Sequence, residues 1–293
     1  MSEARRLWPA VAALALLSLV WGYNWVVMKK VLAFVHPIDF TALRVLFGAL
    51  ALFVVMKLRG VPFRLEAPGA TILLGVLQCG AFSMLIQLAL VGGGAGKTAV
   101  LVYAMPFWLL PLAWLVLGER IQGMQWLAIV LGALGLIGVL EPWELTTNVV
   151  SSVVALSAGA VWAVSAVLAK RLYARSQPDL IALTAWQMLF GAVVVCAIAL
   201  LYPSRPIEPS AYFFGALAYN ALAATALAWL LWLFVLKRLP AGLAGLASLA
   251  VPAVGVLSAW GELGERPSAA EGAGMALIAC ALALLSWRAL RER

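Results

Sequence analysis

Long apolar stretches separated by short polar connections occupy almost the whole chain. A helix needs roughly 20 mostly apolar residues to cross the ~30 Å hydrocarbon layer of a membrane. Ten stretches are close to this length, over residues 7–28, 38–56, 69–91, 95–117, 121–140, 149–169, 180–202, 211–236, 241–261 and 269–287. The pattern predicts an all-α, polytopic membrane protein with ten transmembrane helices, and the short connections leave no soluble domain outside the membrane.

Composition agrees with this prediction, and the charges suggest an orientation. Of the 293 residues, 65% are hydrophobic and 11% are charged, against about 45–50% and about 25% in soluble domains. With the N-terminus inside, fourteen of the 20 Lys and Arg residues lie at inner ends, five lie at outer ends and Arg44 lies within a span. Positive charge favours the cytoplasmic side, so we expect both termini there. The net charge of +8 then reflects topology and does not indicate a nucleic-acid partner.

The two halves of the chain repeat each other. WGYNWVVMKK at 21–30 matches WAVSAVLAKR at 162–171, LFGA at 46–49 recurs at 189–192, Ala104-Met105-Pro106 matches Ala250-Val251-Pro252, and WLVLGER at 114–120 matches WGELGER at 260–266. We therefore divide the chain into a first five-helix repeat, 1–145, and a second, 146–293. Because five crossings is an odd number, the second repeat is predicted to be inverted relative to the first. Such pairs suit alternating access to a midplane site, although channels also use duplication.

These residues permit a comparison with a known family. Five-plus-five spans, a Trp in spans one and six, a Pro within spans four and nine and the repeated Gly-Glu-Arg resemble the EamA-like family of the drug/metabolite transporter superfamily. The segment Val102-Tyr103-Ala104-Met105-Pro106 is similar to span four of bacterial YddG-type amino-acid exporters. The resemblance implies a multi-pass protein of the bacterial cell inner membrane. It also implies export of amino acids from the cytoplasm through a central cavity lined by both repeats.

Polar and aromatic residues inside the spans are the candidate substrate-binding groups. Polar groups are costly in lipid and are expected to face the bundle interior, and aromatic walls suit a small organic solute. We predict a midplane cavity lined by Trp21, Asn24, Phe82, Tyr103, Trp162, Trp229 and Ser248. Pro106 and Pro252 are expected to bend spans four and nine and to take part in gating. Packing between helices is the alternative role for each of these residues.

Arg44 is the one cation placed well inside a span. It lies about six residues into the second span, and Gln187 occupies the equivalent place in the second repeat. A charge at that depth has to pair or to extend toward the membrane surface. Both roles stay open.

The positions of Asp, Glu and His limit the classes of substrate and the kinds of energy coupling that we expect. No Asp or Glu lies near the middle of a predicted span, and the single His, His36, falls in a loop. We therefore expect a neutral or zwitterionic substrate, most simply amino acids including aromatic ones, and transport that does not depend on protons. Nucleosides, sugars and cationic compounds stay as alternatives, while a channel or an intramembrane enzyme has less support.

The sequence suggests neither a catalytic centre nor a bound cofactor. It offers no Ser–His or paired-Asp constellation and no His–carboxylate cluster of the kind that holds a metal. We therefore expect no enzymatic activity, no cofactor and no metal. The expected partners are the lipid bilayer and a small-molecule substrate; the oligomeric state is left open, with a monomer as the working assumption.

Overall fold

The computed structural model describes residues 3–118, 123–140, 148–202, 204–238 and 250–291. The first repeat contains α1 (Glu3–Val31), α2 (Pro37–Arg59), α3 (Pro68–Leu74), the π-helix η1 (Gly75–Ala81), α4 (Phe82–Gly92), α5 (Ala95–Val102), α6 (Met105–Leu117) and α7 (Met124–Leu140). The second contains α8 (Asn148–Ser176), α9 (Leu180–Leu201), α10 (Ala211–Ala218), the π-helix η2 (Tyr219–Leu227), α11 (Ala228–Arg238), α13 (Ala250–Leu263) and α14 (Ala269–Arg291).

The all-α polytopic fold is confirmed, because every predicted apolar stretch contains helix. Within the described residues, seven continuous segments are long and apolar enough to cross a membrane, and three further apolar helices, at 126–139, 251–263 and 269–281, are shorter. Two features differ from a set of plain α-helices. The fourth stretch breaks between Val102 and Met105, and the third and eighth stretches each contain a π-helix.

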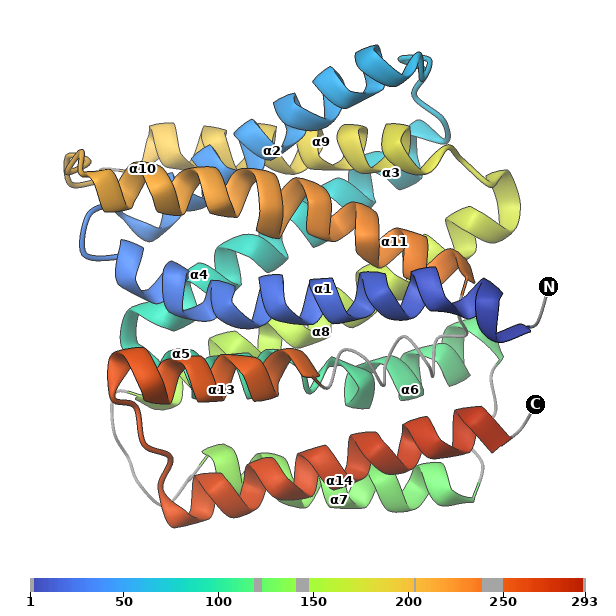
Figure 1. Cartoon of the computed structure of the whole chain (residues 1–293), viewed down its shortest axis with the longest axis vertical. Helices are drawn as coiled ribbons and strands as arrows, with labels where there is room; N and C mark the ends of the chain where they lie inside the picture. Colours follow the sequence, from blue (N-terminus) through green and yellow to red (C-terminus); the bar gives the residue numbers. More distant parts are fainter. Residues whose placement is uncertain (1–2, 119–122, 141–147, 203, 239–249, 292–293) are drawn as a thin grey trace.

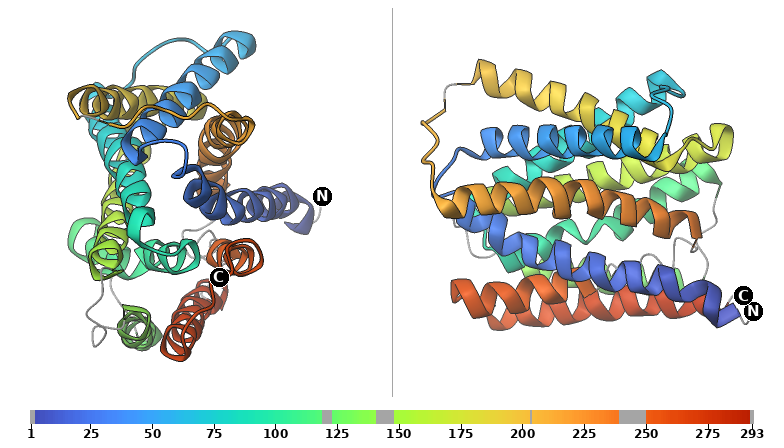
Figure 2. Two further views of the ribbon diagram at one scale, coloured as in Figure 1. Left: turned by 90° about the vertical axis from the view of Figure 1, so that its left-hand side faces the viewer. Right: turned by 45° about the horizontal axis from the view of Figure 1, so that its top comes forward.

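The helices run side by side, and the two repeats run in opposite directions. α1 starts at the end of the bundle where both termini lie, whereas α8 runs toward that end (Figure 1). The α2–α9 pair and the α7–α14 pair lie at opposite edges of the molecule (Figures 1 and 2). This arrangement is the inversion that the odd number of crossings predicts.

Packing between the repeats follows a two-fold pattern. α7 packs on its counterpart α14, and α2 packs on its counterpart α9. Each of the other main contacts has an equivalent in the other repeat. The α1–α13 contact corresponds to α8–α6, the α1–α11 contact to α8–α4, and the α2–η2 contact to α9–η1. Each repeat therefore completes its core with helices of the other, which brings the equivalent spans α1 and α8 to the middle of the molecule.

The repeated LFGA motif has a packing reason. Its glycine in α2, Gly48, lies against η2, so that an added Cβ would be 3.1 Å from Thr225 Cγ2. Its glycine in α9, Gly191, lies against η1, where an added Cβ would be 2.8 Å from the Gly75 carbonyl oxygen. Small residues let membrane helices approach closely. The motif thus sets the spacing between each second span and the π-helix of the other repeat.

Candidate functional site

A small cavity lies between the two repeats, and most of the predicted site residues surround it. Six of the seven predicted binding residues line it: Trp21, Asn24, Phe82, Tyr103, Trp162 and Trp229. They come from α1, from the start of α4, from the break between α5 and α6, from α8 and from α11. Ser248, the seventh, lies outside the described residues. Their role as substrate ligands stays a prediction.

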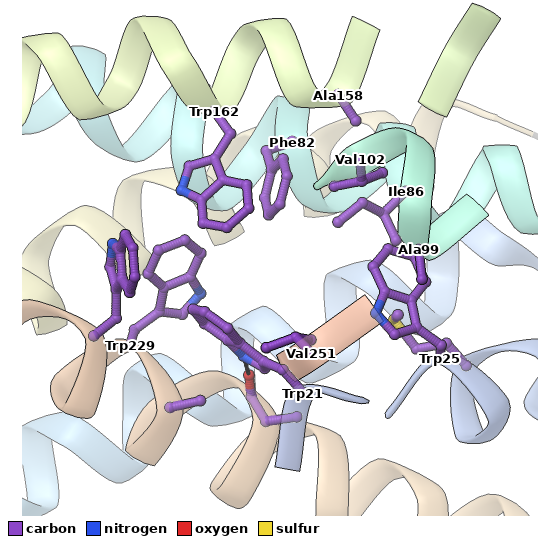
Figure 3. Packing of buried hydrophobic residues seen from close by; sticks show 14 of the residues in the cluster. Trp21, Trp25, Phe82, Ile86, Ala99, Val102, Ala158, Trp162, Trp229 and Val251 are labelled. Carbon is purple, nitrogen blue, oxygen red and sulfur yellow. Dashed lines mark hydrogen bonds between the residues drawn. The ribbon is translucent and has the colours of Figure 1, made fainter. Parts of the chain in front are cut away.

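Trp162 packs against four other aromatic rings of the cavity wall, and Figure 3 shows it beside Phe82. Its ring centroid lies 5.3 Å from that of Phe82, 5.3 Å from that of Tyr103, 6.1 Å from that of Trp21 and 6.5 Å from that of Trp229. The contacts with Trp21, Tyr103 and Trp229 are edge-to-face, an arrangement that aromatic quadrupoles favour. The repeat explains the meeting of Trp21 and Trp162, because equivalent positions on α1 and α8 converge at the two-fold centre.

The two central tryptophans differ in their hydrogen bonds. Trp21 Nε1 donates to the carbonyl oxygen of Ala224 in η2 at 2.9 Å. Trp162 Nε1 is buried and has no hydrogen-bond partner among the described residues, and the same holds for Asn24 Oδ1. Most buried polar atoms have a partner in folded proteins. The cavity therefore offers one free donor and one free acceptor beside its aromatic walls.

Sequence reasoning left the place of Arg44 open, and the structure resolves it. Arg44 is 6% exposed, so its guanidinium does not extend to the surface. It lines the cavity, and its Nη2 donates to the Ser83 carbonyl oxygen at 3.2 Å. Its equivalent, Gln187, is also fully buried but does not line the cavity.

Five further lining residues were absent from the prediction: Trp25, Met28, Ser83, Ile86 and Ala224. Most of them had a visible signal in the sequence. Trp25 and Met28 follow Trp21 at helical spacings of four and seven, so they share its face of α1. Ile86 follows Phe82 at the same helical spacing of four, and Ser83 is a polar residue inside a span, so both also had a signal. Ala224 had none, since its exposure to the cavity depends on how η2 is rotated.

The cavity is small in this conformation. Its volume is about 40 Å³, close to the ~30 Å³ that one water molecule occupies in the liquid, whereas pockets for drug-sized ligands measure roughly 300–1,000 Å³. A solute the size of an amino acid requires the surrounding rings and helices to move apart. The break at Tyr103 and Ala104 lies just before Pro106, near the start of α6, and the gating role of Pro106 stays a prediction. Pro252 lies near the start of α13, but the residues before α13 are outside the described part.

One end of the bundle is held by charged contacts between the repeats. Lys30 on α1 pairs with Glu262 on α13 at 2.5 Å, and Lys97 on α5 pairs with Glu271 on α14 at 2.7 Å. Glu265, from the second Gly-Glu-Arg motif, accepts hydrogen bonds from the backbone N–H groups of Ala95 (2.9 Å) and Gly96 (3.1 Å) at the start of α5. An acidic side chain is favourable at a helix N-terminus, which gives this glutamate a structural role.

A larger cavity, of about 200 Å³, lies among these charged groups. Lys97, Glu265 and Glu271 line it, but each is engaged by the contacts just described. The aromatic cavity is the better candidate site because three of its buried polar atoms, Asn24 Oδ1, Arg44 Nε and Trp162 Nε1, have no partner among the described residues.

An inverted pair of five-helix repeats around a cavity between them is the architecture of many secondary transporters. The profile of the EamA-like transporter family matches residues 8–141 and again residues 150–287. The chain therefore belongs to the EamA-like transporter family. It is a multi-pass membrane transporter for a small-molecule substrate and is not an enzyme.

Relatives with known names agree with this assignment. The chain is 24% identical to the uncharacterized transporter YoaV of Bacillus subtilis over 73% of this chain and 74% of that protein. It is 29% identical to a probable amino-acid metabolite efflux pump of Salmonella typhimurium over 59% of this chain and 58% of that protein. A solved crystal structure has a TM-score of 0.71, with 18% identity, 99% of this chain covered and 100% of that chain covered, which supports the fold.

Proposed function

We propose that this transporter exports small neutral or zwitterionic metabolites, amino acids including aromatic ones, from the cytoplasm across the bacterial inner membrane. The observation that carries the proposal is the cavity between the repeats, with aromatic walls and unpartnered polar atoms. Flat aromatic side chains of a solute would stack on rings such as Trp162 and Phe82, while the polar atoms would orient its charged groups. The name of the Salmonella typhimurium relative points to the same class of substrate.

The mechanism we propose is alternating access. The repeats meet at the cavity, so a rocking motion of one against the other would expose it to one side at a time. The charged contacts of Lys30 and Lys97 would close the end where they lie, and the break before Pro106 would act as a hinge.

We also propose that export does not require a proton gradient. None of the described residues that line the cavity is an Asp, a Glu or a His, and proton relays within membranes use such groups. In liposomes, counterflow of labelled substrate should persist when an ionophore abolishes the proton gradient. Complete arrest, with substrate gradients unchanged, would contradict this part of the proposal.

The main experiment is a counterflow screen in liposomes with labelled amino acids, nucleosides and sugars. Saturable flux of amino acids, strongest for aromatic ones, is the expected result. Trp162→Ala and Tyr103→Ala should lower the flux of aromatic amino acids by about tenfold, since an aromatic contact contributes about 0.5–1.5 kcal/mol beyond its buried area. Trp126→Ala is the matched control, because Trp126 is 55% exposed on α7. Flux that does not saturate would indicate a channel, and unchanged rates and preferences in both cavity variants would assign Trp162 and Tyr103 to packing.

The proposed orientation needs a separate test. Single cysteines at positions 2 and 147, in a chain whose Cys79, Cys196 and Cys280 are replaced, would report both faces of the membrane. With both termini cytoplasmic, an impermeant thiol reagent added to intact cells should label position 147 and not position 2. The reverse pattern would refute the topology.

A further inference from the structure

We propose that Arg44 is the anchor for a carboxylate group of the transported solute, so that the transporter selects molecules with one carboxylate. This inference rests on the proposed function, because it assigns a substrate class to the same cavity. It starts from the surroundings of a single buried charge.

The guanidinium of Arg44 has no opposite charge beside it among the described residues. Arginine has five N–H donors and is always charged, yet its one side-chain hydrogen bond to a described residue goes to the neutral carbonyl of Ser83. Its Nε is buried and has no partner in the part of the chain that the structure describes. Among the described residues, no Asp or Glu forms an ion pair with it or lines the cavity beside it.

A buried charge without an opposite charge beside it lowers the stability of the fold, so its presence indicates a function. Removing a charge from water costs several kcal/mol even after relaxation of the protein, and charged side chains within membrane helices typically mark substrate or ion pathways. Arg44 is 6% exposed, so its guanidinium does not reach the protein surface. An anionic group that enters the cavity would supply the missing partner.

The surroundings favour a carboxylate over other anions. A guanidinium binds a carboxylate through two parallel hydrogen bonds. Arg44 is the sole cationic residue among the described residues that line the cavity. It would balance only one of the two negative charges of a phosphate. Most of the wall is aromatic or aliphatic, which suits an organic acid with an apolar body.

The other unpartnered atoms complete the recognition of an amino acid. Asn24 Oδ1 is an acceptor that an ammonium group would satisfy, and the faces of Trp21 and Trp229 attract a cation through their quadrupoles. An amino acid would then place its carboxylate at Arg44 and its ammonium toward α1. The carboxylate contact is the stronger of the two, because it joins opposite charges in a site with little water.

Three probes of one shape separate these contributions. L-Phenylalanine has both charged groups, 3-phenylpropionate lacks the ammonium, and phenethylamine lacks the carboxylate. Binding to the purified protein in detergent can be followed by tryptophan fluorescence, since Trp21, Trp25, Trp162 and Trp229 line the cavity. We expect binding of both carboxylates and binding of phenethylamine at least tenfold weaker. Equal binding of phenethylamine and L-phenylalanine would overturn the inference.

The variant Arg44→Gln tests the residue itself. Hydrogen bonds to charged groups contribute about 1.5–3 kcal/mol, so the Kd of L-phenylalanine should rise roughly 10- to 100-fold. The Kd of phenethylamine should stay or fall, because a repelling charge is gone. A merely structural role of Arg44 would weaken all three probes alike. Arg44→Lys keeps the charge without the planar fork and should recover part of the preference for carboxylates.

Gln187→Leu is the matched control, since Gln187 is the repeat equivalent of Arg44, is fully buried and does not line the cavity. It should leave the order of the three probes unchanged. If the Arg44→Gln protein keeps the preference for carboxylates, the inference about Arg44 is refuted and the proposed export is not. Loss of all counterflow by the wild type, with carboxylate binding intact, would refute the proposed export and leave the inference standing.

Discussion

The two repeats place equivalent residues at equivalent points of the fold, but these residues form different hydrogen bonds. Trp21 and Trp162 are equivalent, and Trp21 Nε1 donates to the Ala224 carbonyl oxygen while Trp162 Nε1 bonds to none of the described residues. Asn24 and Ser165 are equivalent, and Asn24 Oδ1 accepts from no described residue while the Ser165 hydroxyl donates to carbonyls of its own helix. The shared backbone makes the cavity, and the differences give it two distinct sides.

The same contrast holds at the two ends of the bundle. Lys30 on α1 forms an ion pair with Glu262 on α13. Its equivalent, Arg171 on α8, donates at 3.0 Å to the backbone carbonyl of Val116, the residue that matches Glu262. The two contacts are related by the repeat, but one joins two charges and the other joins a charge and a neutral group. A symmetric scaffold with unequal closures can favour one direction of access, and paired substitutions at equivalent sites test that difference.

The largest effect is expected at the glycines of the LFGA motif. In Gly191→Ala the new Cβ would lie 2.5 Å from Cys79 Cβ and 2.8 Å from the backbone oxygen of Gly75, whereas in Gly48→Ala its nearest neighbour is Thr225 Cγ2 at 3.1 Å. Overpacking costs about 1–3 kcal/mol, and alanine regains up to about 1 kcal/mol of helix propensity. Gly191→Ala should lower the melting temperature in detergent clearly, and Gly48→Ala should change it little. Equal shifts would contradict the unequal spacing.

A second comparison replaces each central tryptophan by phenylalanine. Trp21→Phe leaves the Ala224 carbonyl without its indole donor, and a buried unsatisfied group costs about 1–3 kcal/mol. Trp162→Phe removes a donor that bonds to no described residue, so the loss of stability should be smaller. Thermal unfolding monitored by size-exclusion chromatography can rank the two variants. A less stable Trp162→Phe would mean that its indole has a partner in the membrane state.

A third comparison concerns the polar pair Asn24 and Ser165. Asn24→Leu removes an unpartnered acceptor from the cavity and should leave stability unchanged or slightly higher. It should weaken binding of L-phenylalanine about two- to tenfold, as expected for one hydrogen bond of about 0.5–1.5 kcal/mol. Ser165→Ala is the control and should bind normally. Loss of binding in both variants would point to a general effect of packing on α1 and α8.

The smallest effect is expected at the closures. Lys30 and Glu262 are 35% and 36% exposed, and exposed ion pairs contribute about 0–1 kcal/mol. Glu262→Val should therefore lower stability by less than about 1 kcal/mol but speed thiol labelling of a cysteine at Ile86, with the difference shrinking at high salt. Val116→Glu should slow opening at the other end by giving Arg171 a partner. If the labelling rates do not depend on salt in any variant, the Lys30–Glu262 ion pair does not control opening of this end.

The sequence alone predicted much of the architecture and part of the site. Spans and repeats could be read directly, because apolar length and motif spacing are local properties of the chain. The equivalence of Trp21 and Trp162 placed two rings at the centre of the fold, and Asn24 followed from its spacing to Trp21. The π-helices at 75–81 and 219–227 were not predicted; they lie against Gly191 and Gly48 of the other repeat, contacts that no local pattern reports.

Only the tertiary structure decided how the polar groups are used. Arg44 had two readings from the sequence, and the rotation of α2 against α4 directs it to the cavity and the Ser83 carbonyl. Glu262 meets a lysine 232 residues away in the chain, which no local pattern reports. A membrane span is set by its own composition, whereas the partner of a buried charge is set by which helix faces meet. The sequence therefore determined where the helices run, and their packing determined which polar atoms remain without a partner.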